Sequence, residues 1–418
     1  FTARKKSNCL AGSFGMVGAT ISGISVISVP GQVISSSFSY MNTVIGFILG
    51  YYVVAYVLLP VYYRHGYTSI YQLLGERMGK YTHRTTSIMF LIYKMLGSAI
   101  KLFVVAMVLD KLLFPVLGIN FYVGTALIVL MIYLYTFRSG VSTVVVTDCI
   151  QTLCLFVCSF VLLYQSYNYA SEVSASPFTD VMRMHLGKVM CVASPGESVT
   201  TLLQFLSGMF LVVVMTGLDQ DVMQKNLTCK DLKSAQKNMV LSGYLFVPIN
   251  FILLVIGALL VIGSNSDVSG ISGTSDGLVI EHAQKFGIVA ILSLEIGLLS
   301  ASLSSADSAL VGLTTSYFFD LKGVVIEKIG RRQRYLVHGC FAVLLYLIIC
   351  LCHMYSGKSA LDMIYSLASC MFAPLLGLFV FAIFSKKKVK DSMAVLVIVL
   401  SFGLAIYANQ VLASWGIP

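Results

Sequence analysis

Residues 18–33 read GATISGISVISVPGQV. They belong to an apolar run long enough to cross a membrane, yet Gly18, Gly23 and Pro30 interrupt it. At membrane depth, each backbone group that such residues free needs a partner other than lipid. The stretch therefore predicts a broken helix that lines a cavity. A kinked helix that packs through its small residues is the alternative.

The rest of the chain has the composition of a membrane protein. Of its 418 residues, 57% are hydrophobic and only 11% are charged. Crossing a hydrocarbon core of about 30 Å takes roughly 20 helical residues. Eleven apolar runs meet this length, near 11–36, 39–63, 86–113, 119–136, 140–165, 199–223, 238–262, 287–318, 335–354, 359–384 and 392–413. We therefore predict an all-α integral membrane protein with one membrane domain over residues 1–418.

The basic residues indicate a topology rather than a nucleic-acid partner, although the net charge is +10. Lys and Arg gather in alternate connecting segments, near 4–6, 64–84, 138, 225–237, 322–334 and 386–390. The positive-inside rule then puts the N-terminus of this sequence in the cytoplasm and its C-terminus outside. We expect a multi-pass protein of the cell membrane that functions as a monomer. The odd number of spans and the start at Phe1 lead us to expect a longer natural chain.

A second unusual stretch lies in the eighth span, where residues 299–316 read LSASLSSADSALVGLTTS. Ala301, Ser304, Ser305 and Ser308 follow the i, i+3, i+4, i+7 spacing of one helix face. Such a face serves helix packing in many membrane proteins. Here it also carries Asp307, with no basic residue within reach on its own helix. A carboxylate in a membrane costs roughly 2.5–3.5 kcal/mol, so we expect it to have a partner or a ligand.

A second intramembrane carboxylate lies in the fifth span, where residues 138–151 read RSGVSTVVVTDCIQ. Asp148 follows Gly140 by eight residues, which puts it about 12 Å into the bilayer. Two acids and several hydroxyls form an oxygen-rich environment that suits an alkali cation better than a transition metal. A structural, hydrogen-bonded role for either aspartate is the alternative.

Four motifs resemble the sodium/solute symporter family, which includes bacterial proline, galactose and sialic acid transporters. They are FGMVGATISGISVISVPG at 14–31, SGVSTVVVTDCIQ at 139–151, TGLDQDVMQKNL at 216–227 and SASLSSADSALVGLTTS at 300–316. Their order and spacing are kept over nearly the whole chain. The resemblance implies a five-plus-five inverted repeat with a leucine-transporter-like core. The repeats would cover about 11–166 and 199–384, with an extra C-terminal helix near 392–413, and the helix that precedes the repeat in the family is absent from this sequence.

The resemblance also implies an activity and sodium sites. The expected activity is sodium-coupled symport of a small organic solute by alternating access. A principal sodium site would use backbone carbonyls of the first helix and of the eighth, together with two hydroxyls, which fall on Gly18, Ile21, Ala301, Ser304 and Ser305. Some members have a second sodium site, whose positions match Asp148, Ser304, Asp307 and Ser308. Asp307 departs from the family, in which a hydroxyl is usual there, and it could strengthen the second site or carry a proton.

The substrate positions implied by the family are Ser22, Ser25, Tyr40 and Lys101. Lys101 stands where the sialic acid member holds its substrate carboxylate with an arginine. A buried ammonium needs an anionic partner, either a solute carboxylate or Asp148 and Asp307. Tyr40 and Val44 replace a phenylalanine and a glutamine of that member, which favours a smaller or less hydroxylated acid. A neutral sugar or amino acid stays open. If Asp148 holds a second sodium, transport of an anion should be electrogenic.

Other charged residues receive structural interpretations. Lys94 is expected to snorkel toward the cytoplasm. Asp219 and Asp221, beside Lys225, are interpreted as a cytoplasmic gate or a helix-end salt bridge. We assign no role to Glu295 in the eighth span.

Three other functions are kept as alternatives. An intramembrane aspartyl protease needs a Gly-x-Gly-Asp element. The nearest candidate, Gly217-Leu218-Asp219, does not form one, and Met215 stands where a first glycine would precede Gly217. A sensor or an uncoupled uniporter would not accumulate a solute against its gradient. A proton-coupled symporter, with the proton on Asp307, would work without sodium.

Overall fold

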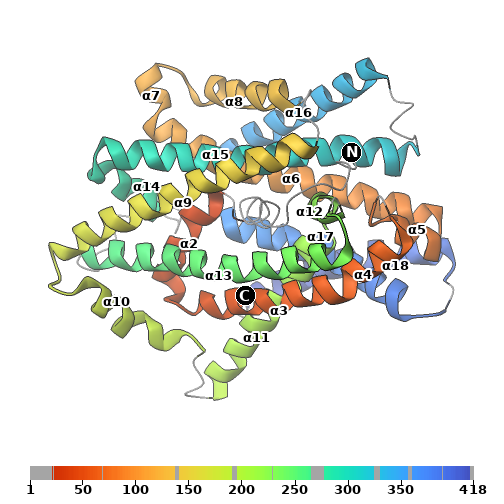
Figure 1. Cartoon of the computed structure of the whole chain (residues 1–418), viewed down its shortest axis with the longest axis horizontal. Coiled ribbons are helices and arrows are strands. Elements are labelled where there is room, and N and C mark those ends of the chain that lie inside the picture. Colours follow the sequence, from red (N-terminus) through yellow and green to blue (C-terminus); the bar gives the residue numbers. More distant parts are fainter. Residues whose placement is uncertain are drawn as a thin grey trace.

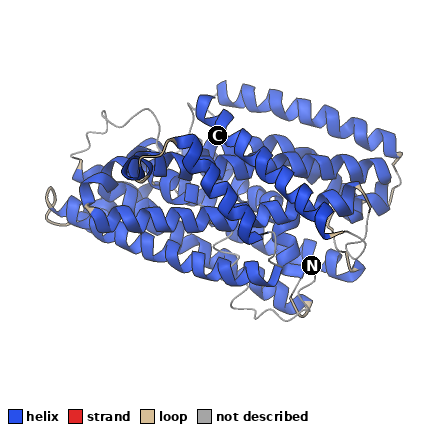
Figure 2. Ribbon diagram, turned by 90° about the horizontal axis from the view of Figure 1, so that it is seen from above, coloured by secondary structure: helices blue, strands red, loops and turns tan. Residues whose placement is uncertain are grey.

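The computed structural model describes residues 21–414 except for 22, 68, 137–140, 191–194, 228, 265–276, 324–329, 356–359 and 388. The described residues form helices and no strands (Figure 2). Eight of these helices are long and apolar enough to cross a membrane. Three shorter apolar helices, Gly23–Ser36, Phe121–Thr136 and Cys370–Phe384, lie in the other predicted spans. Each of the eleven predicted spans is therefore confirmed to contain a helix within the residues that the structure describes.

The long elements keep the order of the predicted spans. They are α2 (Gly23–Ser36), α3 (Tyr40–Val53) continued by η2 (Val54–Leu58) and α4 (Leu59–His65), α6 (Lys80–Leu112), α8 (Phe121–Thr136), α9 (Val141–Ser171), α11 (Pro195–Val212) continued by η4 (Val213–Gly217), α13 (Leu232–Gly263), α15 (Ile288–Ser316) continued by η6 (Tyr317–Leu321), α16 (Arg331–Tyr355), α17 (Ala360–Phe384) and α18 (Asp391–Ser414). Short helices connect them: α5 (Gln72–Met78), α7 (Phe114–Leu117), α10 (Pro177–His185), η3 (Leu186–Lys188), α12 (Gln220–Leu227), α14 (Gly277–Ala283) and η5 (Gln284–Phe286).

The helices pack in two groups that follow a repeat (Figure 1). In the bundle, α2 packs on α13 and α11 packs on α3, while α3 also contacts α13. In the scaffold, α6 contacts α15 and α16, and α8 contacts α15 and α16. In a repeat of five spans, the first span corresponds to the sixth, the second to the seventh and so on. The contact of α2 with α13 then corresponds to that of α11 with α3, and the contact of α9 with α15 corresponds to that of α17 with α6. All four contacts are present. This pairing is what an inverted repeat predicts.

Glycines allow the close approach in both bundle pairs. A Cβ added to Gly257 of α13 would lie 2.1 Å from the carbonyl oxygen of Pro30 in α2. In the α3–α11 pair, a Cβ on Gly208 would lie 2.0 Å from the carbonyl oxygen of Thr43. Membrane helices lack a hydrophobic driving force between them, so backbone contact through small residues stabilises these pairs.

In the first predicted span, the structure describes Ile21 and the residues from Gly23 onward. Ile21 lies in a bend, and α2 starts at Gly23 and continues through Pro30 to Ser36. The break predicted in this span is therefore not at Pro30. Gly18 and Ser22, two predicted site residues, lie outside the described residues.

Candidate functional site

The sixth span contains a helix break that the sequence analysis did not predict. The helix formed by α11 and η4 ends at Gly217, and α12 resumes at Gln220. Two buried tyrosines satisfy the carbonyls that the break frees. The Tyr62 hydroxyl donates to the carbonyl of Gly217 at 3.3 Å, and the Tyr71 hydroxyl donates to that of Leu218 at 2.9 Å. The glycine before the N-cap aspartate of α12 was the sequence signal for this break.

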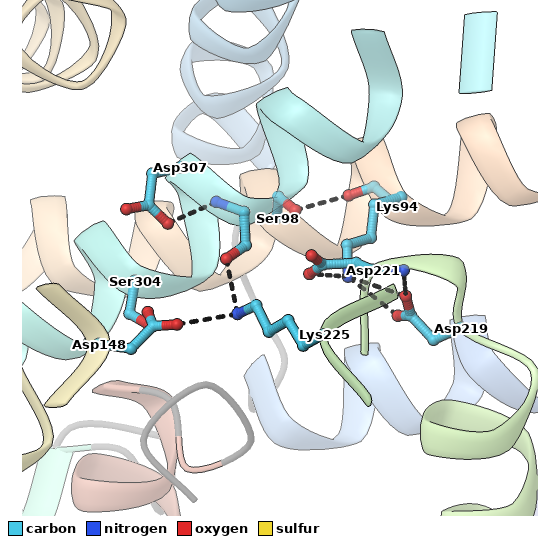
Figure 3. Close-up of polar contacts among 9 residues, drawn as sticks. Lys94, Ser98, Asp148, Asp219, Asp221, Lys225, Ser304 and Asp307 are labelled. Carbon is cyan, nitrogen blue, oxygen red and sulfur yellow. Dashed lines mark hydrogen bonds and ion pairs between the residues drawn. The ribbon is translucent and has the colours of Figure 1, made fainter. Parts of the chain in front are cut away.

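Asp219 both caps α12 and binds a lysine. Its Oδ1 accepts from the backbone N–H of Asp221 at 2.9 Å, the usual side-chain cap of a helix start. Lys94 Nζ lies 2.9 Å from Asp219 Oδ2 and 3.0 Å from Asp221 Oδ2 (Figure 3). The prediction that Lys94 snorkels is therefore wrong, because its side chain is only 13% exposed and two carboxylates hold it. We call Lys94, Asp219 and Asp221 the Lys94 cluster.

Lys225 reaches away from the Lys94 cluster, into the group of oxygens predicted for a second cation. Its Nζ lies 3.0 Å from Asp148 Oδ2 and donates to Ser308 Oγ at 2.8 Å (Figure 3). Ser304 donates its hydroxyl to the other carboxylate oxygen of Asp148. The salt bridges that Asp219 and Asp221 form are thus to Lys94, while Lys225 of α12 pairs with Asp148 of α9. Asp148 is 1% exposed, so this ion pair is buried.

Asp307 faces a different neighbour. Its Oδ2 accepts from the Tyr135 hydroxyl of α8 at 3.0 Å, and its Oδ1 accepts from the backbone N–H of Ser308. The carboxylate is fully buried and does not line the cavity described below. We expected Asp307 to have a partner, and the structure shows that this partner is Tyr135 of the scaffold. Glu295 is also buried, and its Oε1 has no hydrogen-bond partner among the described residues.

Four of the five residues predicted for the principal sodium site are described, and Gly18 is not. Ile21 and Ala301 are buried, and the hydroxyls of Ser304 and Ser305 line the cavity. Ser305 Oγ is buried and has no hydrogen-bond partner within the described residues. Because an unpaired buried hydroxyl is costly, this oxygen is suited to accept a ligand.

A cavity lies between bundle and scaffold, and its volume is about 130 Å³. Three of the four predicted substrate residues, Ser25, Tyr40 and Lys101, line it. Its apolar wall includes Ile24, Phe47, Tyr51, Tyr93, Leu211, Val212, Met215, Val222 and Phe246. Within the described part of the chain, Lys101 has no ion pair or hydrogen bond. Asp148 and Asp307, its alternative partners, have other donors.

Two features now define the class of protein. The chain crosses the membrane many times, and it encloses a small cavity beside an interrupted helix and a set of buried ion pairs. Broken helices that line a midplane cavity are typical of secondary transporters. The family model of the sodium:solute symporter family matches residues 1–398, and the chain belongs to that family. This family of transporters excludes the protease alternative.

Known relatives agree with this assignment. The sodium-dependent multivitamin transporter of Oryctolagus cuniculus is 23% identical over 62% of this chain and 39% of its own length. The sodium-coupled monocarboxylate transporter 2 of Mus musculus is 24% identical over 54% of this chain and 36% of its own length. The chain thus spans well under half of the length of these relatives.

Solved structures confirm the predicted fold. A substrate-bound, outward-open Na⁺-coupled sialic acid symporter aligns with a TM-score of 0.76 at 19% identity, over 99% of this chain and 91% of the other. Mhp1, a nucleobase-cation-symport-1 family transporter, aligns with a TM-score of 0.60 at 15% identity, over 99% and 94%. The fold is that of the leucine-transporter-like transporters, as the sequence motifs implied.

Proposed function

We propose that this protein is a sodium-coupled symporter that imports a small monocarboxylate by alternating access. The observation that carries the substrate class is Lys101, which lines the cavity and forms no ion pair among the described residues. A lysine at membrane depth is costly unless an anion compensates it. A solute carboxylate would be that anion.

The cavity wall favours a small solute with an apolar part. An apolar cavity of about 150 Å³ accommodates benzene, and the cavity here is similar in volume, about 130 Å³. A monocarboxylate could place its carboxylate on Lys101 and its carbon chain against Phe47, Tyr51 and Phe246. Known sodium-coupled monocarboxylate transporters are among the relatives, which supports this class. Ser25 and Tyr40 would offer hydroxyls to a substituent, and Ser22 is kept from the family resemblance.

Sodium is the second substrate in this proposal. Its principal site would consist of the carbonyls of Gly18, Ile21 and Ala301 and the hydroxyls of Ser304 and Ser305. Ser304 donates a hydrogen bond to Asp148, which leaves the lone pairs of the Ser304 oxygen available for a cation. The adjacent Ser305 has a hydroxyl with no hydrogen-bond partner among the described residues. Oxygen ligands of this kind suit a hard cation.

The sodium gradient would supply the driving force. A tenfold gradient is worth about 1.4 kcal/mol, and a membrane potential of 100 mV adds about 2.3 kcal/mol for each net charge moved. One sodium ion transported with a monoanion moves no net charge, so the membrane potential does not contribute to the driving force. The orientation, with the N-terminus of this sequence in the cytoplasm, and a monomeric functional unit remain predictions of the same proposal.

The test is uptake into proteoliposomes that contain the purified protein. The solutes are radiolabelled lactate, pyruvate and butyrate, with glucose and proline as neutral controls. We expect uptake of the acids to need external sodium and to exceed equilibrium. Lys101→Met, which removes the ammonium but keeps the length of the side chain, should reduce uptake at least tenfold, and Lys101→Arg should retain much of it.

One result would contradict sodium coupling, and another would contradict the anionic substrate. Uptake that persists in potassium and collapses with the pH gradient would favour proton coupling over sodium coupling. Uptake of glucose or proline that Lys101→Met leaves unchanged would favour a neutral solute.

A further inference from the structure

The second cation position of the site already contains a cation that belongs to the chain. Four oxygen-bearing residues were predicted for it, and three of them surround the Lys225 ammonium directly or through one hydrogen bond. Lys225 Nζ contacts Asp148 Oδ2 at 3.0 Å and Ser308 Oγ at 2.8 Å. Ser304 is bonded to the other oxygen of Asp148 (Figure 3).

An ammonium and a sodium ion compete for the same lone pairs. Lysine has three N–H donors and no acceptor, so each of its contacts uses an oxygen lone pair that a metal ion would need. Two positive charges on one carboxylate would also repel each other in a buried site. Asp148 is 1% exposed and the Lys225 side chain 9%, which limits screening by water. Sodium could bind at Asp148 only if Lys225 left.

Two features hold α12 so that Lys225 lies beside Asp148: the helix start at Gln220 and the Lys94 cluster. The break after Gly217 lets α12 start anew at Gln220, with Asp219 as its cap. The Lys94 cluster then ties the first turn of α12 to α6. Lys225 follows Asp221 by four residues, so both side chains start from one face of the short helix. Asp221 then contacts Lys94, and Lys225 contacts Asp148. The same anchor that satisfies Lys94 therefore presents Lys225 to Asp148.

We propose that Lys225 replaces the second sodium ion, so that the protein binds one sodium ion and transports one sodium per solute. This inference rests on the proposed function, and it replaces the two-sodium alternative left open by the sequence. Asp148 then acts as a positioning residue. Held by Lys225, it accepts a hydrogen bond from the Ser304 hydroxyl, so that the lone pairs of the Ser304 oxygen are left for the principal site. For a monocarboxylate, such a cycle is electroneutral.

The first test counts sodium ions bound at saturation by the purified full chain, with radiolabelled sodium and no solute. We expect one ion per protein for the wild type and one for Lys225→Arg, which keeps the cation. Lys225→Met, which frees Asp148 and Ser308, should bind two ions. Lys225→Met with Asp148→Asn should return to one. If the single change impairs folding, the wild-type count still decides, because two bound ions in the wild type would overturn the proposal.

The second test measures the ratio of sodium to lactate flux in proteoliposomes. The wild type should give a ratio of one and an uptake rate that an imposed potential does not change. In Lys225→Met the ratio should rise to two, and uptake should become faster when the interior is negative.

The outcomes separate this inference from the function. Two sodium ions in the wild type, reduced to one by Asp148→Asn, would overturn the role of Lys225 and leave sodium symport intact. A Lys225→Met protein that still binds one ion would also overturn it. A wild type that binds no sodium would contradict the proposed function and this inference together.

Discussion

Removing one charge of the Lys225–Asp148 ion pair should destabilise the protein far more than removing both. The two atoms lie 3.0 Å apart, and at an effective dielectric constant of about 20 the attraction is about 5.5 kcal/mol. Asp148→Asn deletes this attraction and leaves a buried ammonium uncompensated. Because breaking a buried pair from one side typically costs about 3–5 kcal/mol, we expect a loss of that size.

The double variant provides the control. Asp148→Asn with Lys225→Met keeps the volume of both side chains and removes both charges, which is often neutral or stabilising. Since the neutral amide still offers an oxygen to Ser304, we expect the double variant to lie within about 1 kcal/mol of the wild type.

The free energy of unfolding is measured by titrating the detergent-solubilised protein with denaturant. The buffer contains potassium instead of sodium, so that sodium binding does not contribute. The double-mutant cycle should give a coupling energy of at least about 3 kcal/mol, well above the roughly 0.5 kcal/mol within which independent sites add. A loss under about 1 kcal/mol for Asp148→Asn, or a double variant as unstable as the single one, would refute the buried ion pair.

Other predictions address the sodium site, the helix packing and the Lys94 cluster. Sodium at a hundredfold over its dissociation constant should stabilise the wild type by about 2.7 kcal/mol relative to matched potassium, and Ser305→Ala should abolish most of this shift in a thermal unfolding assay. Gly257→Ala should cost about 1–3 kcal/mol because its Cβ meets a carbonyl oxygen of α2, whereas Gly403→Ala, with open space around it, should not destabilise. Lys94→Met deprives the largely buried carboxylates of Asp219 and Asp221 of their ion-pair partner. We therefore expect lower expression of folded protein, measured by size-exclusion chromatography, while Lys94→Arg should fold.

The eleven spans could be predicted from the sequence because each is a local property: an apolar run of sufficient length becomes a helix in lipid whatever its neighbours are. The serine face of the eighth span was also local, and the structure puts Ser304, Ser305 and Ser308 on the cavity as the spacing indicated. Asp148 could also be predicted to lie deep in the membrane and to need a partner, because its distance from the start of its span is local as well.

The ion-pair partner of each buried charge could not be predicted in this way, because the partners lie far apart in the sequence. Lys225 lies 77 positions from Asp148, and Lys94 lies 125 positions from Asp219. Sequence proximity suggested a Lys225 contact with Asp221, but residues four apart on a short helix can also diverge to separate neighbours. The break after Gly217 decides which way each side chain points, and it depends on Tyr62 and Tyr71, which lie far away in the sequence. Only the assembled bundle brings these groups together.

The charges around the cavity provide a reason for joint binding of solute and sodium. The charged side chains that line the described cavity, or that form ion pairs beside it, are Lys94, Lys101, Lys225, Asp148, Asp219 and Asp221. With lysines and aspartates ionised, these charges sum to zero. A solute carboxylate would pair with Lys101 but leave the whole site with one excess negative charge, and sodium alone would leave it with one excess positive charge. Either excess is costly where the dielectric constant is low. A carboxylate and one sodium ion together restore neutrality, so each should raise the affinity of the other by the same factor. A second sodium would break this balance, unless Lys225 were removed.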